Sequence, residues 1–236
     1  MNPLWSELCA NAGVSMDEAR GALFGRYLDL LTEANARMNL TRITDRSGAE
    51  LNHVADALTL LPLIPKETAK LIDVGSGGGV PGIPLAIALP ETTVTLVEAT
   101  KKKAAFLRDA CRELGLTNVI VVDERAEDTG AVGSMLRDAF DVATVRAVAT
   151  MPWLVEWCLP LVRKGGKLLC MKGPKVMDEL PEAKYALKQC NGGQPIIHPV
   201  RLPGTENRLI VEIEKLGRTD ARYPRKATLA KGKPLS

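Results

Sequence analysis

The sequence predicts an α/β fold in which a mainly parallel sheet carries helices on both faces. From residue 69 onward, short apolar runs alternate with helical segments of about 10–15 residues, the pattern of strand–helix–strand units. Residues 1–65 lack this alternation and have helical spacing instead. The 236 residues are 46% hydrophobic and 25% charged, which suits one large core. We therefore expect a helical extension at 1–65, a sheet domain at 66–214 and a basic tail at 215–236.

Two capping boxes organise the helical extension. Ser15–Glu18 has the S-x-x-E pattern before apolar residues that recur at helical spacing from Leu23 to Met38. Ser47–Glu50 has the same pattern and predicts a second helix that ends near Pro62. His53 and Asp56 share one face of this second helix, as a surface pair or as functional residues.

Seven strands are expected in the remainder of the chain, at 71–74, 94–97, 119–122, 140–145, 167–171, 195–200 and 208–213. Helices are expected at 84–89, 101–114, 152–162 and 176–188. Ligands of such sheets bind beyond the carboxyl ends of the strands, so the residues at those ends are the candidates for function.

The glycine-rich stretch 75–82 follows the first strand and precedes a helix, an arrangement typical of nucleoside-binding sites. Read literally, residues 77–82 satisfy the G-x-G-x-x-G dinucleotide fingerprint. Asp73 favours S-adenosylmethionine, because an acid two residues before Gly75 gives the acid-x-G-x-G pattern of class I methyltransferases. Pro81 and Pro84 also leave fewer amides for a pyrophosphate. An NAD(P)-dependent oxidoreductase is the competing interpretation.

The expected cofactor residues extend beyond this loop. Glu98 ends the second strand and can accept hydrogen bonds from ribose hydroxyls. The acidic segment 123–128 follows the third strand, where it would border an adenine or form a plain surface loop. In the loop itself, the candidates are Gly75, Ser76, Gly77, Gly79 and Val80.

The segment after the fourth strand would face the transferred methyl group. It contains neither an Asp/Asn-Pro-Pro-aromatic motif nor a cysteine, but it does contain Arg146, which can pair with phosphate, a guanine edge or the cofactor. A salt bridge from Arg146 to Glu127 or Asp128 is the structural alternative. An acceptor such as guanine N7 carries no proton, so no general base is required.

Basic residues point to a polyanionic partner. Lys172, Arg201 and Arg208 stand at strand ends, and residues 215–236 hold seven basic residues against one acidic residue in a chain of net charge +3. The alternative is a solvated, fraying terminus. With three each of Phe, Trp and Tyr, a base-stacking RNA-recognition module is not expected.

The remaining composition excludes other classes. Five dispersed cysteines indicate reduced thiols, and the two histidines lack the spacing of metal ligands, so no metal site is expected. No apolar run approaches the ~20 residues that span a bilayer, and no signal segment follows Met1. A cytoplasmic protein without membrane association is expected.

The chain resembles the bacterial 16S ribosomal RNA guanine-N7 methyltransferases, also called glucose-inhibited division protein B. The resemblance covers nearly the whole length and is carried by 39–41, 53–58, 73–84, 145–147, 172–173 and 223–226. Ala57 and Gly78 stand where the family commonly has serine and proline.

This resemblance implies a class I methyltransferase fold and methyl transfer from S-adenosylmethionine to N7 of a guanine in the 530 loop of small-subunit rRNA. By position, Gly75 and Val80 would line the cofactor, Ala126 and Glu127 would flank its adenine, and Arg146 would lie between cofactor and substrate. Lys172, Arg201, Arg208, Arg225 and Lys226 are the candidates for RNA contact, and a monomer acting on 16S rRNA in the small subunit is expected. A small-molecule methyltransferase and a non-catalytic rRNA or assembly-factor binding module are the alternatives.

Overall fold

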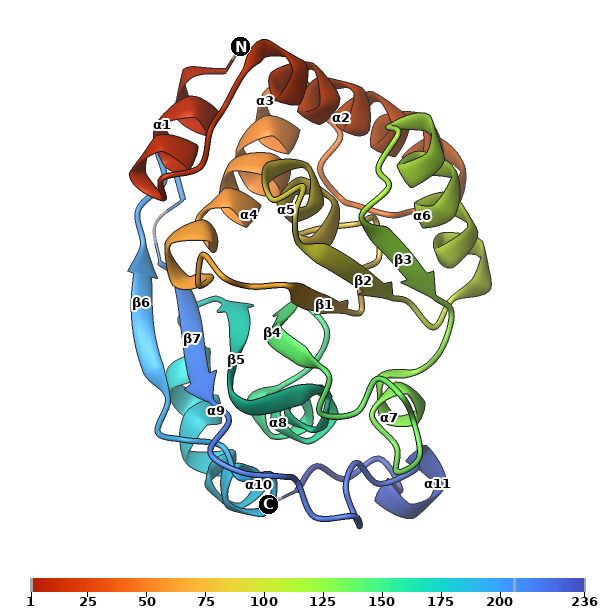
Figure 1. Ribbon diagram of the computed structural model, residues 1–236, viewed down its shortest axis with the longest axis vertical. Coiled ribbons are helices and arrows are strands. Elements are labelled where there is room, and N and C mark those ends of the chain that lie inside the picture. The colour runs from red at the N-terminus through yellow and green to blue at the C-terminus, as the bar shows by residue number, and fades with distance from the viewer. Residues whose placement is uncertain (1, 206, 236) are drawn as a thin grey trace.

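A seven-stranded sheet lies between two layers of helices (Figure 1) in the computed structural model, which describes residues 2–205 and 207–235. The strand order is β3-β2-β1-β4-β5-β7-β6, and β7 runs antiparallel to β5 and β6. The strands are β1 (Lys70–Val74), β2 (Thr93–Val97), β3 (Val119–Val122), β4 (Phe140–Arg146), β5 (Val162–Lys172), β6 (Ile196–Val200) and β7 (Arg208–Glu214). The expected seven-stranded, mainly parallel sheet is confirmed.

The helices divide between the two faces of the sheet in chain order (Figure 1). One layer holds α1 (Pro3–Asn11), α2 (Glu18–Met38), α3 (Arg46–Ala49), a π-helical turn (Glu50–Ala55), α4 (Asp56–Leu58), α5 (Gly82–Ala88) and α6 (Lys101–Glu113). The other holds α7 (Ala126–Thr129), α8 (Met151–Cys158), α9 (Val176–Glu182), α10 (Lys184–Gln189) and α11 (Ala227–Ala230). No helix of the described part is long and apolar enough to cross a membrane.

Alternation along the strands gives each layer its own core. In β1, Leu71 packs with the layer of α1–α6, whereas Ile72 and Val74 pack with the layer of α7–α11. The helical extension therefore covers one face of the sheet and brings α4 to the edge where the site forms.

Both capping boxes were predicted at the wrong residue. The N-cap of α2 is Asp17, whose carboxylate accepts a hydrogen bond from Arg20 N at 2.8 Å. The N-cap of α3 is Asp45, which accepts from Gly48 N at 2.7 Å. An aspartate stands two residues from each expected serine, and its charged oxygen favours the free amides and positive dipole of the helix start.

Two other helices are shorter than expected because of proline. Pro160 lies in the 3₁₀ turn that follows α8, so the predicted helix 152–162 ends at Cys158. Pro181 lies near the end of α9, and the predicted helix 176–188 divides into α9 and α10.

The C-terminal segment 215–235 packs against the domain. Tyr223 and Leu235 are buried in the core beside α8. Lys215 is fully buried, and its Nζ donates to Leu159 O at 2.7 Å and to Thr219 Oγ1. Burial lowers the pKa of Lys215 to about 8. Lys215 therefore belongs to the interior and not to an exposed basic surface.

Candidate cofactor and substrate pockets

The glycine loop between β1 and α5 is held from both sides. Gly75 N and Ser76 N donate to Val97 O at 2.8 and 3.0 Å. Gly77 N donates to the Glu98 carboxylate at 3.0 Å, and the buried Tyr27 hydroxyl of α2 donates to Gly78 O at 2.8 Å. The loop is thus fixed by β2 and by the helical extension.

Asp73 lies beneath this loop. Its carboxylate accepts hydrogen bonds from Gly82 N at 3.1 Å and from Thr144 Oγ1 at 3.2 Å. Burial raises the pKa of Asp73 to about 6, although these hydrogen bonds act in the opposite direction. Asp73 therefore joins the start of α5 to β4 and orders the loop.

Two glycines of the loop differ in the space around them. Gly75 has φ +74°, and a Cβ there would lie 2.5 Å from Val148 Cγ2. Gly77 has φ +55°, and a Cβ there would have no neighbour closer than Gly75 O at 3.9 Å, so it would project into open space. The backbone at Gly77 is therefore open to close approach by a ligand, which fits S-adenosylmethionine.

A first cavity of about 250 Å³ opens beside the loop. Its lining is Leu31, Leu40, Thr41, His53, Gly75, Ser76, Gly77, Gly78, Val80, Glu98, Lys103, Arg146 and Ala147. We call it the cofactor pocket. It lies at the carboxyl ends of β1, β2 and β4, where the fold predicts a ligand.

Six of the expected cofactor residues line this pocket: Gly75, Ser76, Gly77, Val80, Glu98 and Arg146. Four lie outside its lining: Asp73, Gly79, Ala126 and Glu127. Ala126 and Glu127 begin α7 directly after β3, and Glu127 is buried. Sequence reasoning missed Thr41 and Lys103, although the lysine run after Glu98 offered a signal for Lys103.

His53 and Asp56 are buried and do not form a surface pair, so that alternative is wrong. The His53 Nε2 atom lies 3.0 Å from Thr41 Oγ1, and Nδ1 has no partner among the described residues. Burial lowers the pKa of His53 to about 4, so the ring is neutral at pH 7. A neutral imidazole thus lines the cofactor pocket, and its unpartnered Nδ1 atom is buried.

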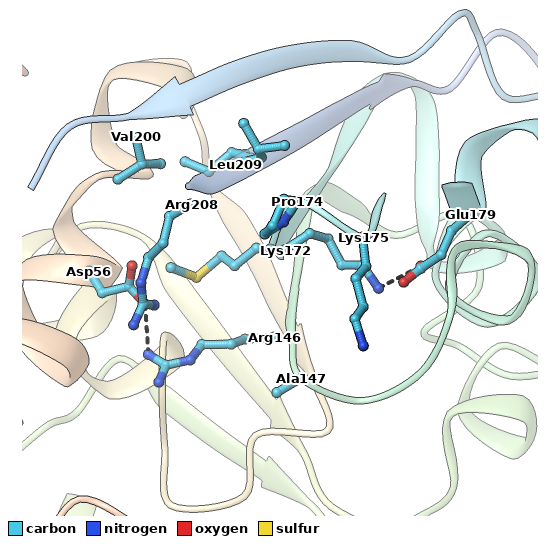
Figure 2. Close-up of a pocket in the computed structure, with 13 residues that line it drawn as sticks. Asp56, Arg146, Ala147, Lys172, Pro174, Lys175, Glu179, Val200, Arg208 and Leu209 are labelled. Carbon is cyan, nitrogen blue, oxygen red and sulfur yellow. Dashed lines mark hydrogen bonds and ion pairs between the residues drawn. The ribbon is translucent and has the colours of Figure 1, made fainter. Parts of the chain in front are cut away.

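Asp56 holds two arginines at the boundary of this pocket (Figure 2). Arg146 Nη1 donates to Asp56 Oδ2 at 3.0 Å, and Arg208 Nη1 donates to the same oxygen. Asn52 binds both arginines as well, through its backbone oxygen at 2.6 Å and its side-chain oxygen at 2.7 Å. The expected alternative partners of Arg146, Glu127 and Asp128, are therefore wrong, and its carboxylate partner is Asp56.

Burial raises the pKa of Asp56, and the two guanidinium groups oppose that shift. The Asp56 side chain is 1% exposed, whereas Arg146 is 19% and Arg208 30% exposed. The arginines therefore retain an accessible edge, and the carboxylate that joins them does not.

A second cavity of about 540 Å³ also borders Arg146 (Figure 2). Its lining is Asp56, Arg146, Ala147, Met171, Lys172, Gly173, Pro174, Lys175, Glu179, Val200, Arg208, Leu209 and Ile210. Lys172 Nζ contacts Glu179 at 2.7 Å and Ala149 O at 3.0 Å. Arg146 and Ala147 line both cavities, so this cavity adjoins the cofactor pocket. A substrate bound beside the cofactor would lie here, and we call it the substrate pocket.

The five residues expected to bind RNA lie in two separate regions of the structure. Lys172 and Arg208 line the substrate pocket, and Arg201 is exposed beside Val200. Arg225 forms a two-bond ion pair with the buried Glu156, and Lys226 is exposed next to it. The expected set is therefore divided between the pocket and the C-terminal segment.

The described residues form neither a metal-binding cluster nor a pocket lined by cysteine. No cluster of three or more His, Cys, Asp or Glu side chains there could hold a metal ion. All five cysteines are free and buried, and none is in the described lining of either pocket.

Comparison with known proteins gives one consistent family. The GidB family model, described as rRNA small subunit methyltransferase G, matches residues 21–202. Relatives named ribosomal RNA small subunit methyltransferase G include one from Lactobacillus johnsonii, 40% identical with all of both chains covered, and one from Chloroflexus aggregans, 44% identical with 94% of this chain and 93% of the relative covered.

Solved structures share the fold at low sequence identity. M. jannaschii TYW2 in complex with AdoMet aligns with a TM-score of 0.53 and 17% identity, covering 75% of this chain and 79% of that chain. A SAM-dependent methyltransferase from Aquifex aeolicus aligns with a TM-score of 0.56 and 15% identity, covering 75% and 97%. The fold is that of the class I S-adenosylmethionine-dependent methyltransferases.

Proposed function

Because the chain belongs to the rRNA small subunit methyltransferase G family, we propose that it transfers a methyl group from S-adenosylmethionine to N7 of a guanine in the 530 loop of 16S rRNA. The observation that carries this proposal is the pair of adjoining pockets that share Arg146 and Ala147. One pocket is closed in by glycine backbone, and the other is bordered by cations. A cofactor in the first and a nucleotide in the second would meet at Arg146.

The residues of the first pocket suit the cofactor. Glu98 already accepts amides from Gly77 and Thr100, and its position at the end of β2 suits the ribose hydroxyls. The backbone at Gly77 leaves room for the nucleoside. Bound S-adenosylmethionine supplies an electrophilic methyl group, and the protein supplies its orientation.

Transfer to N7 needs positioning and no proton acceptor. The N7 lone pair forms the new N–C bond while the bond from carbon to sulfur breaks, so the positive charge moves from sulfur to the guanine ring and no proton is transferred. Holding the two reactants in line can contribute about 7–11 kcal/mol. Arg146 is the proposed positioning residue, because Asp56 and Asn52 fix its guanidinium between the two pockets.

The rim of the substrate pocket supplies cations for the RNA backbone. Lys172, Lys175 and Arg208 line it, and Arg201 stands exposed at its side. A basic rim suits a phosphate-rich substrate better than a small neutral metabolite. We propose the small ribosomal subunit as the assembly that presents the RNA, a monomer as the active form, and the cytoplasm as the compartment.

Methyl transfer from labelled S-adenosylmethionine tests the proposal. The protein is incubated separately with naked 16S rRNA, assembled small subunits and a metabolite extract, and the labelled nucleotide is mapped by mass spectrometry. We expect label at N7 of one guanine in rRNA. Label only in metabolites would refute the rRNA substrate, and cofactor binding without transfer would favour a binding module.

Arg146→Ala gives the matched variant. We expect it to remain folded and to lose transfer, since Arg146 would touch both reactants. Turnover equal to that of the unchanged protein would remove Arg146 from the site.

A further inference from the structure

Two of the three tryptophans stack on the outer side of α8. The rings of Trp153 and Trp157 have centroids 5.0 Å apart and planes inclined by 28°, and both residues are partly exposed. Arg225 Cζ lies 5.8 Å from the Trp153 centroid. The third tryptophan, Trp5, is buried against Phe24. This aromatic pair is not part of either pocket.

The C-terminal segment is anchored beside this stack. Glu156 of α8 is fully buried and accepts Arg225 Nε at 2.8 Å, Arg225 Nη2 at 2.7 Å and the Arg225 backbone amide at 2.9 Å. Arg225 Nη2 also donates to Lys233 O at 2.9 Å. Arg137 donates to the carbonyls of Tyr223 and Thr219, each at 2.8 Å. The segment is therefore fixed in place.

The anchored segment presents mainly positive charge to solvent. Its exposed basic residues are Arg218, Arg222, Lys226, Lys231 and Lys233. Its one acidic residue, Asp220, is paired with Arg222 at 2.9 Å. Lys226 follows Arg225 in the chain, and the backbone oxygen of Lys233 accepts from Arg225, so the backbone of both lysines lies near the tryptophan stack. Lys231 is the residue that follows α11 on the same segment.

This surface begins close to the substrate pocket. Met151 N, at the start of α8, donates to Glu179 at 2.8 Å, and Glu179 pairs with the pocket residue Lys172. Trp153 follows two residues later, about 3 Å along the helix axis. An RNA strand with one base in the pocket could therefore continue over α8.

We propose that the surface formed by Trp153, Trp157 and the lysines at 226, 231 and 233 binds single-stranded RNA next to the target nucleotide. Aromatic rings stack bases without sequence preference, and lysines neutralise phosphates, so the combination recognises unpaired strand. This inference rests on the proposed function, because it concerns the same RNA substrate. It assigns the folded C-terminal segment and α8 to one contact surface.

Tryptophan fluorescence during titration with an oligoadenylate of about 12 nucleotides tests the inference. In the full-length protein carrying Trp5→Phe, the signal comes from Trp153 and Trp157 alone. We expect the oligoadenylate to quench this fluorescence, with an association constant that falls as the salt concentration rises. The charge-reversed variant Lys226→Glu/Lys231→Glu/Lys233→Glu should bind oligoadenylate more than tenfold more weakly. Its salt slope, the slope of the logarithm of the association constant against the logarithm of the salt concentration, should be smaller in magnitude by about 2, since each single-strand phosphate contact contributes about 0.7.

The matched control reverses three exposed lysines near the opposite ends of the strands, Lys66, Lys70 and Lys164. It carries the same change in net charge and should keep the slope of the unchanged protein. Equal behaviour of the two triple variants would overturn the inference, as would titration without quenching. Unchanged oligoadenylate binding with lost binding to assembled subunits would indicate a protein partner and would also overturn it.

Oligoadenylate contains no guanine, so this binding does not depend on methyl transfer. If oligoadenylate quenches the fluorescence with the expected salt slopes but the protein methylates no rRNA, the proposed function is refuted and the RNA-binding surface is still supported. Normal rRNA methylation by the C-terminal variant, with KM and salt slope unchanged, would refute the surface alone.

Discussion

Replacing Asp56 with alanine removes the carboxylate that joins Arg146 to Arg208. Both guanidinium groups share one oxygen of a side chain that is 1% exposed. Deleting one partner of a buried ion pair costs about 3–5 kcal/mol. Both arginines retain hydrogen bonds to Asn52 and some access to water, so we expect the lower end, about 3 kcal/mol in the free energy of unfolding. For a chain of 236 residues, this lowers Tm by about 6–12 °C.

Urea unfolding followed by circular dichroism measures the change. The control is Glu113→Ala, which removes an exposed pair to Arg26 at 3.8 Å and should cost less than about 1 kcal/mol. The double variant Asp56→Ala/Arg208→Leu also removes one of the two facing positive charges, so it should lose less stability than the sum of its single variants. A loss no larger than that of Glu113→Ala, or additive single variants, would refute the reasoning.

The same variant should affect catalysis. Without Asp56, the guanidinium of Arg146 is held by Asn52 alone and faces the like charge of Arg208. A shift of about 1 Å in a positioning group can reduce the rate about 100-fold, so we expect kcat for methyl transfer to fall about 10- to 100-fold. Cofactor affinity, measured by calorimetry, should change less than kcat.

Three further changes test other parts of the molecule. Gly75→Ala should weaken S-adenosylmethionine binding more than tenfold in calorimetry, because its Cβ would lie 2.5 Å from Val148 at positive φ, whereas Gly173→Ala, with no atom within 4 Å, should not. Asp73 has a pKa raised from 3.8 to about 6, so the folded state binds its proton more tightly and loses about 3 kcal/mol of stability as pH rises from about 4 to 6. Urea unfolding should show that loss relative to Asp73→Asn, and parallel pH curves would contradict it. Lys215 has a pKa lowered from 10.5 to about 8, so stability relative to Lys215→Met should rise between pH 8 and 10.5 and stay level below pH 8.

Local pattern predicted most of the fold. The glycine loop and most strand boundaries depend on residues that are near in sequence, although β5 begins at Val162 and not at the expected Lys167. Glu98 was found because the end of β2 lies beside the end of β1 in any such sheet. Helix starts were less certain, since Asp17 and Ser15 both offer a capping oxygen and only the structure shows which one accepts an amide.

Long-range ion pairs could not be predicted in this way. Glu127 and Asp128 were reasonable partners for Arg146 by charge, yet its partner Asp56 lies 90 residues away on the helical extension. The same holds for two positive charges of the C-terminal segment. Lys215 is buried in the interior, and Arg225 forms an ion pair with Glu156. Composition records charge and does not record which side chains face solvent.

The contact between Asp56 and Arg208 spans 152 residues, and this separation affects how the protein is made. A ribosome that has synthesised β1 to β5 has produced every residue of the first pocket but not the arginine that completes the second. Contacts between distant residues form late and slowly. The nascent chain should therefore gain the ability to bind cofactor before it gains a complete site for RNA, and catalytic competence should begin only with the addition of β7.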